Sequence, residues 1–169
     1  LREYAARRIF EPLGMRDTFF SDDPVEIVRN RASGYKRLEN GRVVNDMTNL
    51  FWVGDGGLHT TLDDMRIWDR YFYSPSLGRD PAALLKKINK PNSDADARGA
   101  RYANGQFTGE IEGYRAFWHS GGWLGTLTHY ARFPQLRTSL MLMCNDASID
   151  IDTLVDQVLE ILLTEDRSP

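Results

Sequence analysis

The sequence predicts an α+β fold in which a helical, loop-rich first part precedes an antiparallel meander sheet with a C-terminal helix. Apolar residues at helical spacing and clusters of turn residues dominate the chain before residue 98. Short apolar segments separated by turns follow from Arg101, and a last segment has one apolar face at helical spacing. We therefore expect residues 1–98 to form one region and residues 99–169 to form a second region built on the sheet.

The first elements of the chain are expected to be short. Residues 1–10 have apolar positions at helical spacing, and Pro12 and Gly14 are expected to close that helix. Because the chain opens on what reads as the end of a helix, we expect a segment to precede it. Ser21-Asp22-Asp23-Pro24 is typical of a helix start and predicts a short turn to about Arg29.

A hairpin and an amphipathic helix are expected next. Residues 35–44 predict a hairpin around the turn Asn40-Gly41. Thr60 or Thr61 is expected to cap a helix that continues to about Tyr73 on one apolar face.

The residues around this helix have ordinary structural explanations. Asp63 and Asp64 favour its positive N-terminal end, so their pairing needs no catalytic role. His59 precedes the cap and is expected in a loop. Residues 81–90 predict a further short helix, and the polar stretch 91–99 predicts an exposed loop.

The second region is expected to contain four strands joined by tight turns, at about residues 101–109, 112–119, 125–133 and 137–144. The final element, from Asp150 to about Leu163, has apolar residues three and four apart. That helix should cover one face of the sheet.

Composition limits the classes of partner. With 41% apolar and 27% charged residues, the chain has the make-up of an ordinary globular domain. The net charge is -3 and the basic residues are scattered, which argues against a nucleic acid or an anionic membrane as partner. No apolar run has the length of a membrane helix.

Cysteine and histidine usage argues against metal chemistry. The single Cys144 excludes an internal disulfide and is expected in a buried strand. His59, His119 and His129 lack the spacing of metal ligands, and His129 is expected at a solvent-facing or packed strand position. The sequence therefore predicts neither a metal nor a cofactor.

Several segments resemble the serine β-lactamase and penicillin-binding-protein family, in its class C-like, esterase and D-peptidase branch. They follow one another in the family's order over nearly the whole chain. The family patterns are "PLGM..T.F", "A.GY", "GGL.ST..DL", "YGLG", "H.GG" and "LTN". The matching segments are Pro12 to Phe20, Ala32 to Tyr35, Gly56 to Met65, Tyr102 to Phe107, His119 to Gly122, and Met143 to Asn145.

The resemblance implies a partial β-lactamase/transpeptidase-like fold and an acyl-transfer enzyme in which a serine attacks a carbonyl. It places His119 where the family has the lysine of its Lys-Thr-Gly strand, as an anchor for the substrate. Ser120 would donate its hydroxyl to the same substrate group, and Gly121 and Gly122 would keep the strand edge open. The amide of Gly122 would contribute to the oxyanion hole. A small-molecule acyl substrate is implied: a β-lactam, a D-amino-acid peptide or an ester.

The family's nucleophile motif Ser-x-x-Lys and its Tyr-x-Asn motif lie upstream of the segment that Pro12 begins. Two local matches, Ser33 with Lys36 and Tyr102-Ala103-Asn104, are interpreted as coincidental. Ser-x-x-Lys requires a helix, whereas the setting of Ser33 predicts a hairpin, on which the two side chains point to opposite faces. Tyr102 lies in the same predicted meander as His119, whereas the family separates these motifs by a helical region. We therefore expect no catalytic residue on this chain.

Three hypotheses about function stay open. In the favoured hypothesis, the chain is the C-terminal part of a serine hydrolase whose nucleophile lies on a missing segment, so the chain alone is inactive. Alternatively, it is a complete but non-catalytic protein that binds ligands or partners, or Ser33 is a genuine nucleophile. Upstream sequence that carries both motifs would favour the first hypothesis. A start codon near Leu1 would favour the second, and covalent labelling of Ser33 would favour the third.

Partners and substrate pocket follow from the same resemblance. An exposed sheet edge would invite the missing N-terminal segment or self-association. Family members are often periplasmic or secreted, and a signal would lie on residues before Leu1. Trp118, Trp123 and Phe51-Trp52 are possible pocket walls, although core packing is the favoured explanation for each of them.

Overall fold

The computed structural model describes residues 1–47, 53–96 and 99–165, and the side chains among them up to residue 163. These residues form two compact units. One contains residues 1–31 and the described part of 48–90, and the other contains residues 32–47 and the described part of 91–169. The predicted boundary between 1–98 and 99–169 stays a prediction.

The first unit begins with helix α1 (Arg2–Ala5), the π-helical segment η1 (Ala6–Phe10) and helix α2 (Glu11–Leu13). Of the two residues expected to close this helix, Gly14 does so at a φ of 81°, whereas Pro12 does not, because the helix continues to Leu13. Proline has no amide hydrogen and its ring crowds the carbonyl one turn earlier. The wider η1 turn before Pro12 is a known way to accommodate such a break in the hydrogen-bond ladder.

Two expectations about the next segment are also wrong. The helix start expected at Ser21-Asp22-Asp23-Pro24 does not form, and the segment instead has turns at residues 24–25 and 29–30, because Ile27 is 89% exposed and no apolar face is buried. His59 lies not in a loop but in strand β4 (Leu58–His59), which pairs with strand β1 (Phe19–Phe20). Its ring stacks on Phe19 with centroids 5.3 Å apart.

The two predicted amphipathic helices are confirmed as α3 (Leu62–Tyr71) and α4 (Pro81–Ile88). Thr61 caps α3 by accepting a hydrogen bond from the Asp64 amide at 3.2 Å, and Asp80 caps α4 in the same way through the Ala83 amide at 2.9 Å. The apolar sides of α3 and α4 meet around Tyr71, Phe72 and Leu77.

Asp64 has a structural role beyond the first turn of its helix. Its side chain is buried, and Oδ2 accepts hydrogen bonds from the Thr18 hydroxyl at 2.7 Å and from the Asp17 amide at 2.8 Å. Thr18 also contacts Thr60, with 2.8 Å between the hydroxyl oxygens. This carboxylate therefore ties the segment before β1 to the start of α3.

We predict that Asp64→Ala lowers the free energy of unfolding by about 2–3 kcal/mol, because a charged acceptor is lost and the Asp17 amide is left without its partner. The neighbouring Asp63 is exposed, so Asp63→Ala should cost less than about 1 kcal/mol, the range of a helix-dipole effect. Urea denaturation of both variants measures the difference. Equal losses would contradict this role of Asp64.

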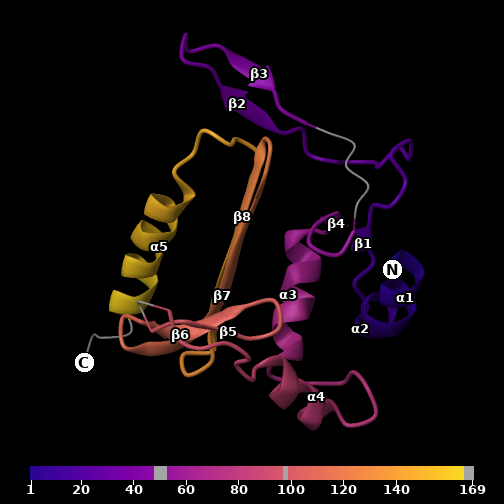
Figure 1. Ribbon diagram of the computed structural model, residues 1–169, viewed down its shortest axis with the longest axis vertical. Helices are drawn as coiled ribbons and strands as arrows, with labels where there is room; N and C mark the ends of the chain where they lie inside the picture. Colours follow the sequence, from indigo (N-terminus) through magenta and orange to yellow (C-terminus); the bar gives the residue numbers. More distant parts are fainter. Residues whose placement is uncertain (48–52, 97–98, 166–169) are drawn as a thin grey trace. The chain divides into compact units, whose positions relative to one another are not determined.

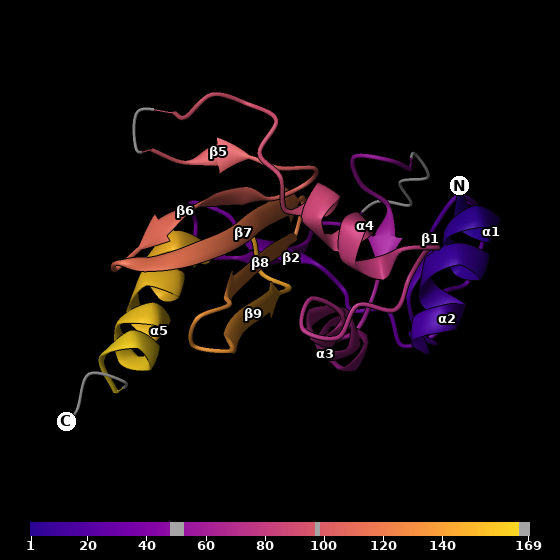
Figure 2. The same cartoon turned by 90° about the horizontal axis from the view of Figure 1, so that it is seen from below.

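The second unit contains the predicted hairpin and the predicted meander, and both are confirmed. Strands β2 (Tyr35–Arg37) and β3 (Val43–Asn45) form the hairpin. Five antiparallel strands form the sheet in the order β5-β6-β7-β8-β9 (Figure 2). Their bounds are β5 (Arg101–Tyr102), β6 (Phe107–Ile111), β7 (Tyr114–Trp123), β8 (Thr126–Phe133) and β9 (Thr138–Cys144).

The single strand expected over 101–109 is wrong, because the chain turns between β5 and β6. Asn104 and Gly105 have φ values of 50° and 93°, and this left-handed backbone cannot continue a strand. Cys144, expected to be buried, is half-buried at the end of β9.

Helix α5 (Ile151–Glu165) covers one face of the sheet, as predicted (Figure 1). Val155, Leu159 and Leu163 pack against small and apolar residues of β7, β8 and β9, namely Ala116, Ala131, Phe133 and Leu140. The predicted α+β class, with an antiparallel sheet and a C-terminal helix, is therefore confirmed.

Two glycines bring the β2–β3 hairpin against the turn that joins β7 to β8. A Cβ atom on Gly34 would lie 3.0 Å from the carbonyl carbon of Gly125, and one on Gly125 would overlap the backbone of Gly34 and Tyr35. The Gly125 amide donates to the Asp46 carbonyl at 2.8 Å. Contact between bare backbones thus fixes the end of β7.

We expect Gly125→Ala to lower the free energy of unfolding by about 1–3 kcal/mol, because the overlap forces the hairpin away from the turn. The control is Gly41→Ala, where the new methyl group meets open space and only the φ of 80° is unfavourable. Amide exchange separates the two effects. Exchange at residue 125 should become faster in Gly125→Ala and stay unchanged in Gly41→Ala.

Candidate functional site

The segment His119–Gly122 lies inside strand β7. The strand predicted to end at about residue 119 continues to Trp123, because residues 120–123 also pair with β8. The pairs are His119↔Tyr130, Ser120↔His129, Gly121↔Thr128 and Gly122↔Leu127. All four β7 residues are exposed.

One edge of this segment has no strand beside it. Strand β6 begins at Phe107, which pairs with Trp118, so the pairing of β6 with β7 stops one residue before His119. On the described part of the chain, no strand pairs with residues 119–123 from that side. The last residues of β7 therefore extend past β6 while they remain paired with β8.

The turn between β6 and β7 determines which backbone groups face the open edge. Glu112 and Gly113 have φ values of 52° and 80°, as in a type I′ turn, so Ile111 and Tyr114 close the hairpin as a hydrogen-bonded pair. Such pairs alternate along an antiparallel ladder, so every second residue from Tyr114 directs its backbone groups toward β6. Ser120 and Gly122 belong to this set. Their N–H and C=O groups therefore point to the edge that β6 leaves open.

The glycines allow close packing on the β8 side. A Cβ atom on Gly121 would lie 2.8 Å from the Thr128 hydroxyl, and one on Gly122 would lie 3.1 Å from a methyl carbon of Leu127. Side chains of β8 therefore occupy the space that larger residues on β7 would need.

Aromatic rings surround His119. Its Nε2 lies 3.4 Å from the Tyr102 hydroxyl, and its ring stacks with Phe107 at a centroid distance of 5.8 Å. Tyr102 and Phe107 also contact each other edge to face. The short β5 strand therefore contributes to the surroundings of His119, which the sequence did not indicate.

Ser120 contacts a histidine on the neighbouring strand. Its Oγ lies 2.9 Å from Nδ1 of His129, and His129 is only 6% exposed. Of the two positions expected for His129, the packed one is correct. Its contact with Ser120 depends on the β7–β8 register, so no local sequence signal could have identified it.

The two local motif matches, Ser33 with Lys36 and Tyr102-Ala103-Asn104, lie on or next to strands and not on helices. Ser33 precedes β2, and its carbonyl accepts a hydrogen bond from the Asn145 side chain at 3.0 Å. Lys36 lies on β2, and its ammonium group bonds Asp46 at 2.9 Å. In Tyr102-Ala103-Asn104, the asparagine begins the turn after β5. The predicted non-helical setting of Ser33 is therefore confirmed.

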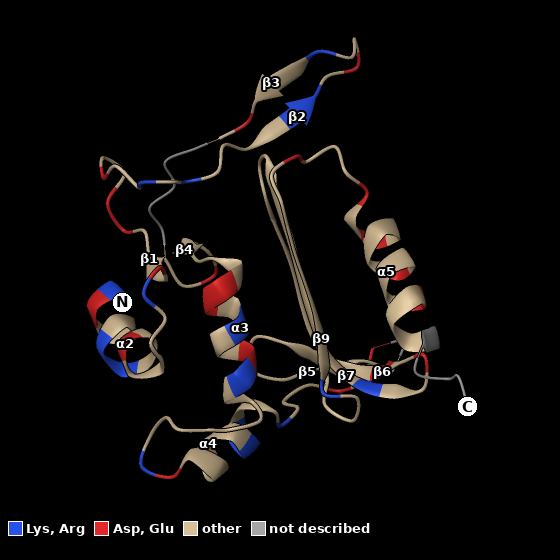
Figure 3. Ribbon diagram, turned by 180° about the vertical axis from the view of Figure 1, so that it is seen from behind, with Lys and Arg blue, Asp and Glu red and all other residues tan. Residues whose placement is uncertain are grey.

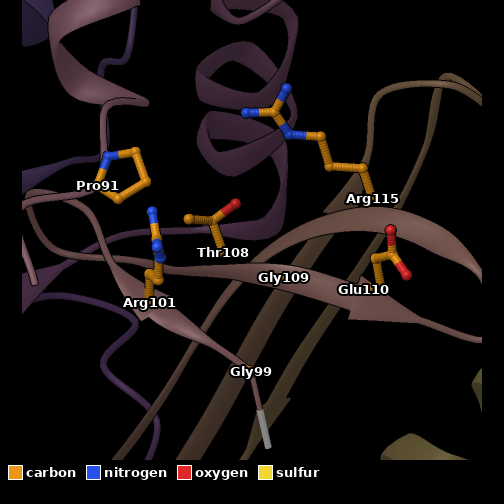
Figure 4. Close-up of a pocket in the computed structure, with 7 residues that line it drawn as sticks. All are labelled: Pro91, Gly99, Arg101, Thr108, Gly109, Glu110 and Arg115. Atoms are coloured by element: carbon orange, nitrogen blue, oxygen red, sulfur yellow. The ribbon is translucent and has the colours of Figure 1, made fainter. Parts of the chain in front are cut away.

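The possible pocket walls have different positions. Trp118 packs against the core beneath α5, whereas Trp123 is 48% exposed at the end of β7. Phe51-Trp52 lies outside the described residues. A separate open cavity of about 450 Å³ lies over β5, β6 and β7, where Arg101 and Arg115 flank Thr108 (Figure 4). No residue of His119–Gly122 lines it.

Two further properties concern the described ranges, residues 1–47, 53–96 and 99–165. No group of three or more His, Cys, Asp or Glu side chains there is placed to hold a metal ion. Within the same ranges, no helix has the length and apolar character needed to cross a membrane.

The sequence and fold define a family. The model of the family described as beta-lactamase matches residues 1–160, so the chain belongs to the beta-lactamase family. D-aminopeptidase from Gluconobacter oxydans (strain 621H) is 27% identical over 141 residues, which cover 83% of this chain and 26% of that protein. D-aminopeptidase from Brucella ovis is 28% identical over 145 residues, 86% of this chain and 27% of the relative. The chain thus spans about a quarter of the length of the curated relatives it matches.

Solved structures share the fold. The octameric penicillin-binding protein homologue from Pyrococcus abyssi superposes with a TM-score of 0.83 at 21% identity, over 96% of this chain and 37% of that one. D-amino acid amidase from Ochrobactrum anthropi SV3, complexed with L-phenylalanine amide, gives a TM-score of 0.72 at 22% identity, over 99% of this chain and 52% of that one. The predicted resemblance to β-lactamases and penicillin-binding proteins, with its D-peptidase branch, is therefore confirmed.

Proposed function

We propose that this chain is the C-terminal part of a serine hydrolase that cleaves the amide or peptide bond of a D-amino acid through an acyl-serine intermediate. The observation that carries the proposal is the open edge of β7, where no strand of the described residues pairs with Ser120 and Gly122 on the side away from β8. An extended acyl substrate can approach such an edge and receive hydrogen bonds from it. The D-amino-acid substrate class is favoured by the names of the relatives, D-aminopeptidase and D-amino acid amidase.

In this proposal, four residues of β7 bind the substrate. The Gly122 amide stabilises the oxyanion that forms when a serine attacks the carbonyl, because an oriented N–H group acts where negative charge develops. The Ser120 hydroxyl bonds a polar group of the substrate, and His119 anchors the same group. Gly121 and Gly122 keep the approach free of side chains.

The nucleophile is assigned to a segment outside this chain. Two observations support this part of the proposal: Lys36 bonds Asp46 instead of reaching Ser33, and the chain matches only about a quarter of each D-aminopeptidase. The attacking serine forms an ester with the substrate's acyl group, the amine leaves, and water then hydrolyses the ester.

The partner of the sheet belongs to the same proposal. β9 pairs with β8 along one edge, and no described strand pairs with residues 138–144 along the other. Unpaired strand edges favour the addition of another strand. We assign this edge to the preceding segment of the same protein or, failing that, to a second copy.

Labelling with a fluorophosphonate followed by intact-mass spectrometry tests the function. The 169-residue chain should gain no adduct, and the full-length gene product should gain one on a serine that precedes Leu1. The full-length protein should hydrolyse D-alanine p-nitroanilide at least about tenfold faster than the L-isomer, and penicillin tests the β-lactam alternative. An adduct on Ser33 or Ser120 would overturn the assignment of the nucleophile.

A Tyr102→Phe substitution tests whether that tyrosine is part of the chemistry. Its hydroxyl is 3.4 Å from His119, a long contact, so its removal should change kcat/KM of the full-length protein by less than about threefold. A hydroxyl that transfers a proton in the reaction would cost about 100-fold or more. Steady-state kinetics distinguish the two outcomes, and thermal unfolding checks that the ring still packs on Phe107.

A further inference from the structure

Ser120 and His129 form a polar pair that spans β7 and β8. The register places them directly opposite each other, and Ser120 Oγ lies 2.9 Å from His129 Nδ1. Their exposures differ sharply, since Ser120 is exposed and the imidazole is 6% exposed. The hydrogen bond therefore joins an exposed residue at the open edge of β7 to a buried residue of β8.

His129 is buried on the face of the sheet that α5 covers. It pairs with Leu142 of β9, and the next residue of β8 on the same face, Ala131, is fully buried beneath α5. Nε2 of His129 is buried and has no hydrogen-bond partner among the described residues. The hydrogen bond through Nδ1 is thus the contact that holds this ring's polar side toward the surface.

Burial favours the neutral form of the His129 imidazole. Burial lowers the pKa of His129, and the carboxylates of Asp152 and Asp156 on α5 oppose that shift without reversing it. His119 on β7 lowers the pKa further. In Figure 3, red segments mark Asp and Glu positions along the ribbon of α5, and the neighbouring strands are mostly tan. A neutral ring preserves the hydrogen bond in either tautomer, because a hydroxyl can donate or accept.

We propose that His129 is a positioning residue that holds the Ser120 hydroxyl in one rotamer at the open edge of β7. Without such a partner, an exposed serine side chain is free to populate its staggered rotamers. A hydroxyl that is already held in one rotamer loses no further rotamer freedom when it binds a substrate group. The inference rests on the proposed function, in which Ser120 contacts the substrate.

Two isosteric choices at position 129 provide a sharp test. Asparagine can place a polar atom where Nδ1 lies, whereas glutamine places its polar atoms near Nε2. In the full-length gene product, His129→Gln should raise KM for D-alanine p-nitroanilide by about five- to tenfold with kcat nearly unchanged, the signature of a lost binding contact. His129→Asn should restore KM to within about twofold of the wild-type value. Equal KM values for the two variants would overturn the proposal.

A double-mutant cycle separates positioning from general loss of structure. In a Ser120→Ala background, His129→Gln should have no further effect on KM, because the residue acts through the missing hydroxyl. A full additional loss would assign His129 a purely structural role and overturn the inference. The matched serine control is Ser76→Ala, an exposed position in the other unit, which should leave KM unchanged.

A spectroscopic measurement tests the pair without substrate. In full-length protein with ¹⁵N-labelled histidine, Ser120→Ala should shift the Nδ1 resonance of His129 and leave that of His59 in place. No shift at Nδ1 would overturn the pair itself. If the shift occurs but Ser120→Ala leaves KM unchanged, the proposed role of Ser120 in substrate binding fails while the hydrogen bond stands.

Discussion

The pairing of β7 with β8 is the constraint on which the rest of this structure depends. It continues to Trp123↔Thr126, whereas the pairing of β7 with β6 stops at Trp118↔Phe107, so among the described residues one edge of β7 is paired to its end and the other is open beyond Trp118. In a strand paired on both sides, all backbone N–H and C=O groups are already hydrogen-bonded. In a segment paired on neither side, the direction of these groups is not fixed. The one-sided pairing provides both rigidity and access, which is what a backbone binding edge requires.

The contacts that support the β7–β8 pair come from distant parts of the sequence. Helix α5 buries the face of the sheet that contains Ala116 and Ala131, and His129 is buried on the same face. The β2–β3 hairpin contacts the turn that joins β7 to β8, where Gly34 and Gly125 allow the two backbones to touch. The family resemblance of Ala32 to Tyr35 thus has a mechanical basis, because only glycine fits at that crossing.

The sequence predicted a candidate site segment but not its geometry. Family patterns pointed to His119, Ser120, Gly121 and Gly122, and the hairpin pattern around Asn40-Gly41 separated Ser33 from Lys36. The same patterns could not reveal that Tyr102 and Phe107 lie beside His119, or that Ser120 meets His129. These contacts depend on strand register, and a shift of one residue would reverse the face of every side chain.

Local sequence determined the elements whose stability is local: the caps Thr61 and Asp80, the apolar face of α5 and the turns between strands. It misjudged Pro12, His59 and residues 21–29, where packing against other segments decides whether a propensity is realised. Only the tertiary structure decided the open edge of β7 and the burial of His129, because each depends on where a neighbouring strand ends or a distant helix packs. The apolar periodicity of a segment predicts which of its faces is buried, whereas an open strand edge depends on how several segments pack together.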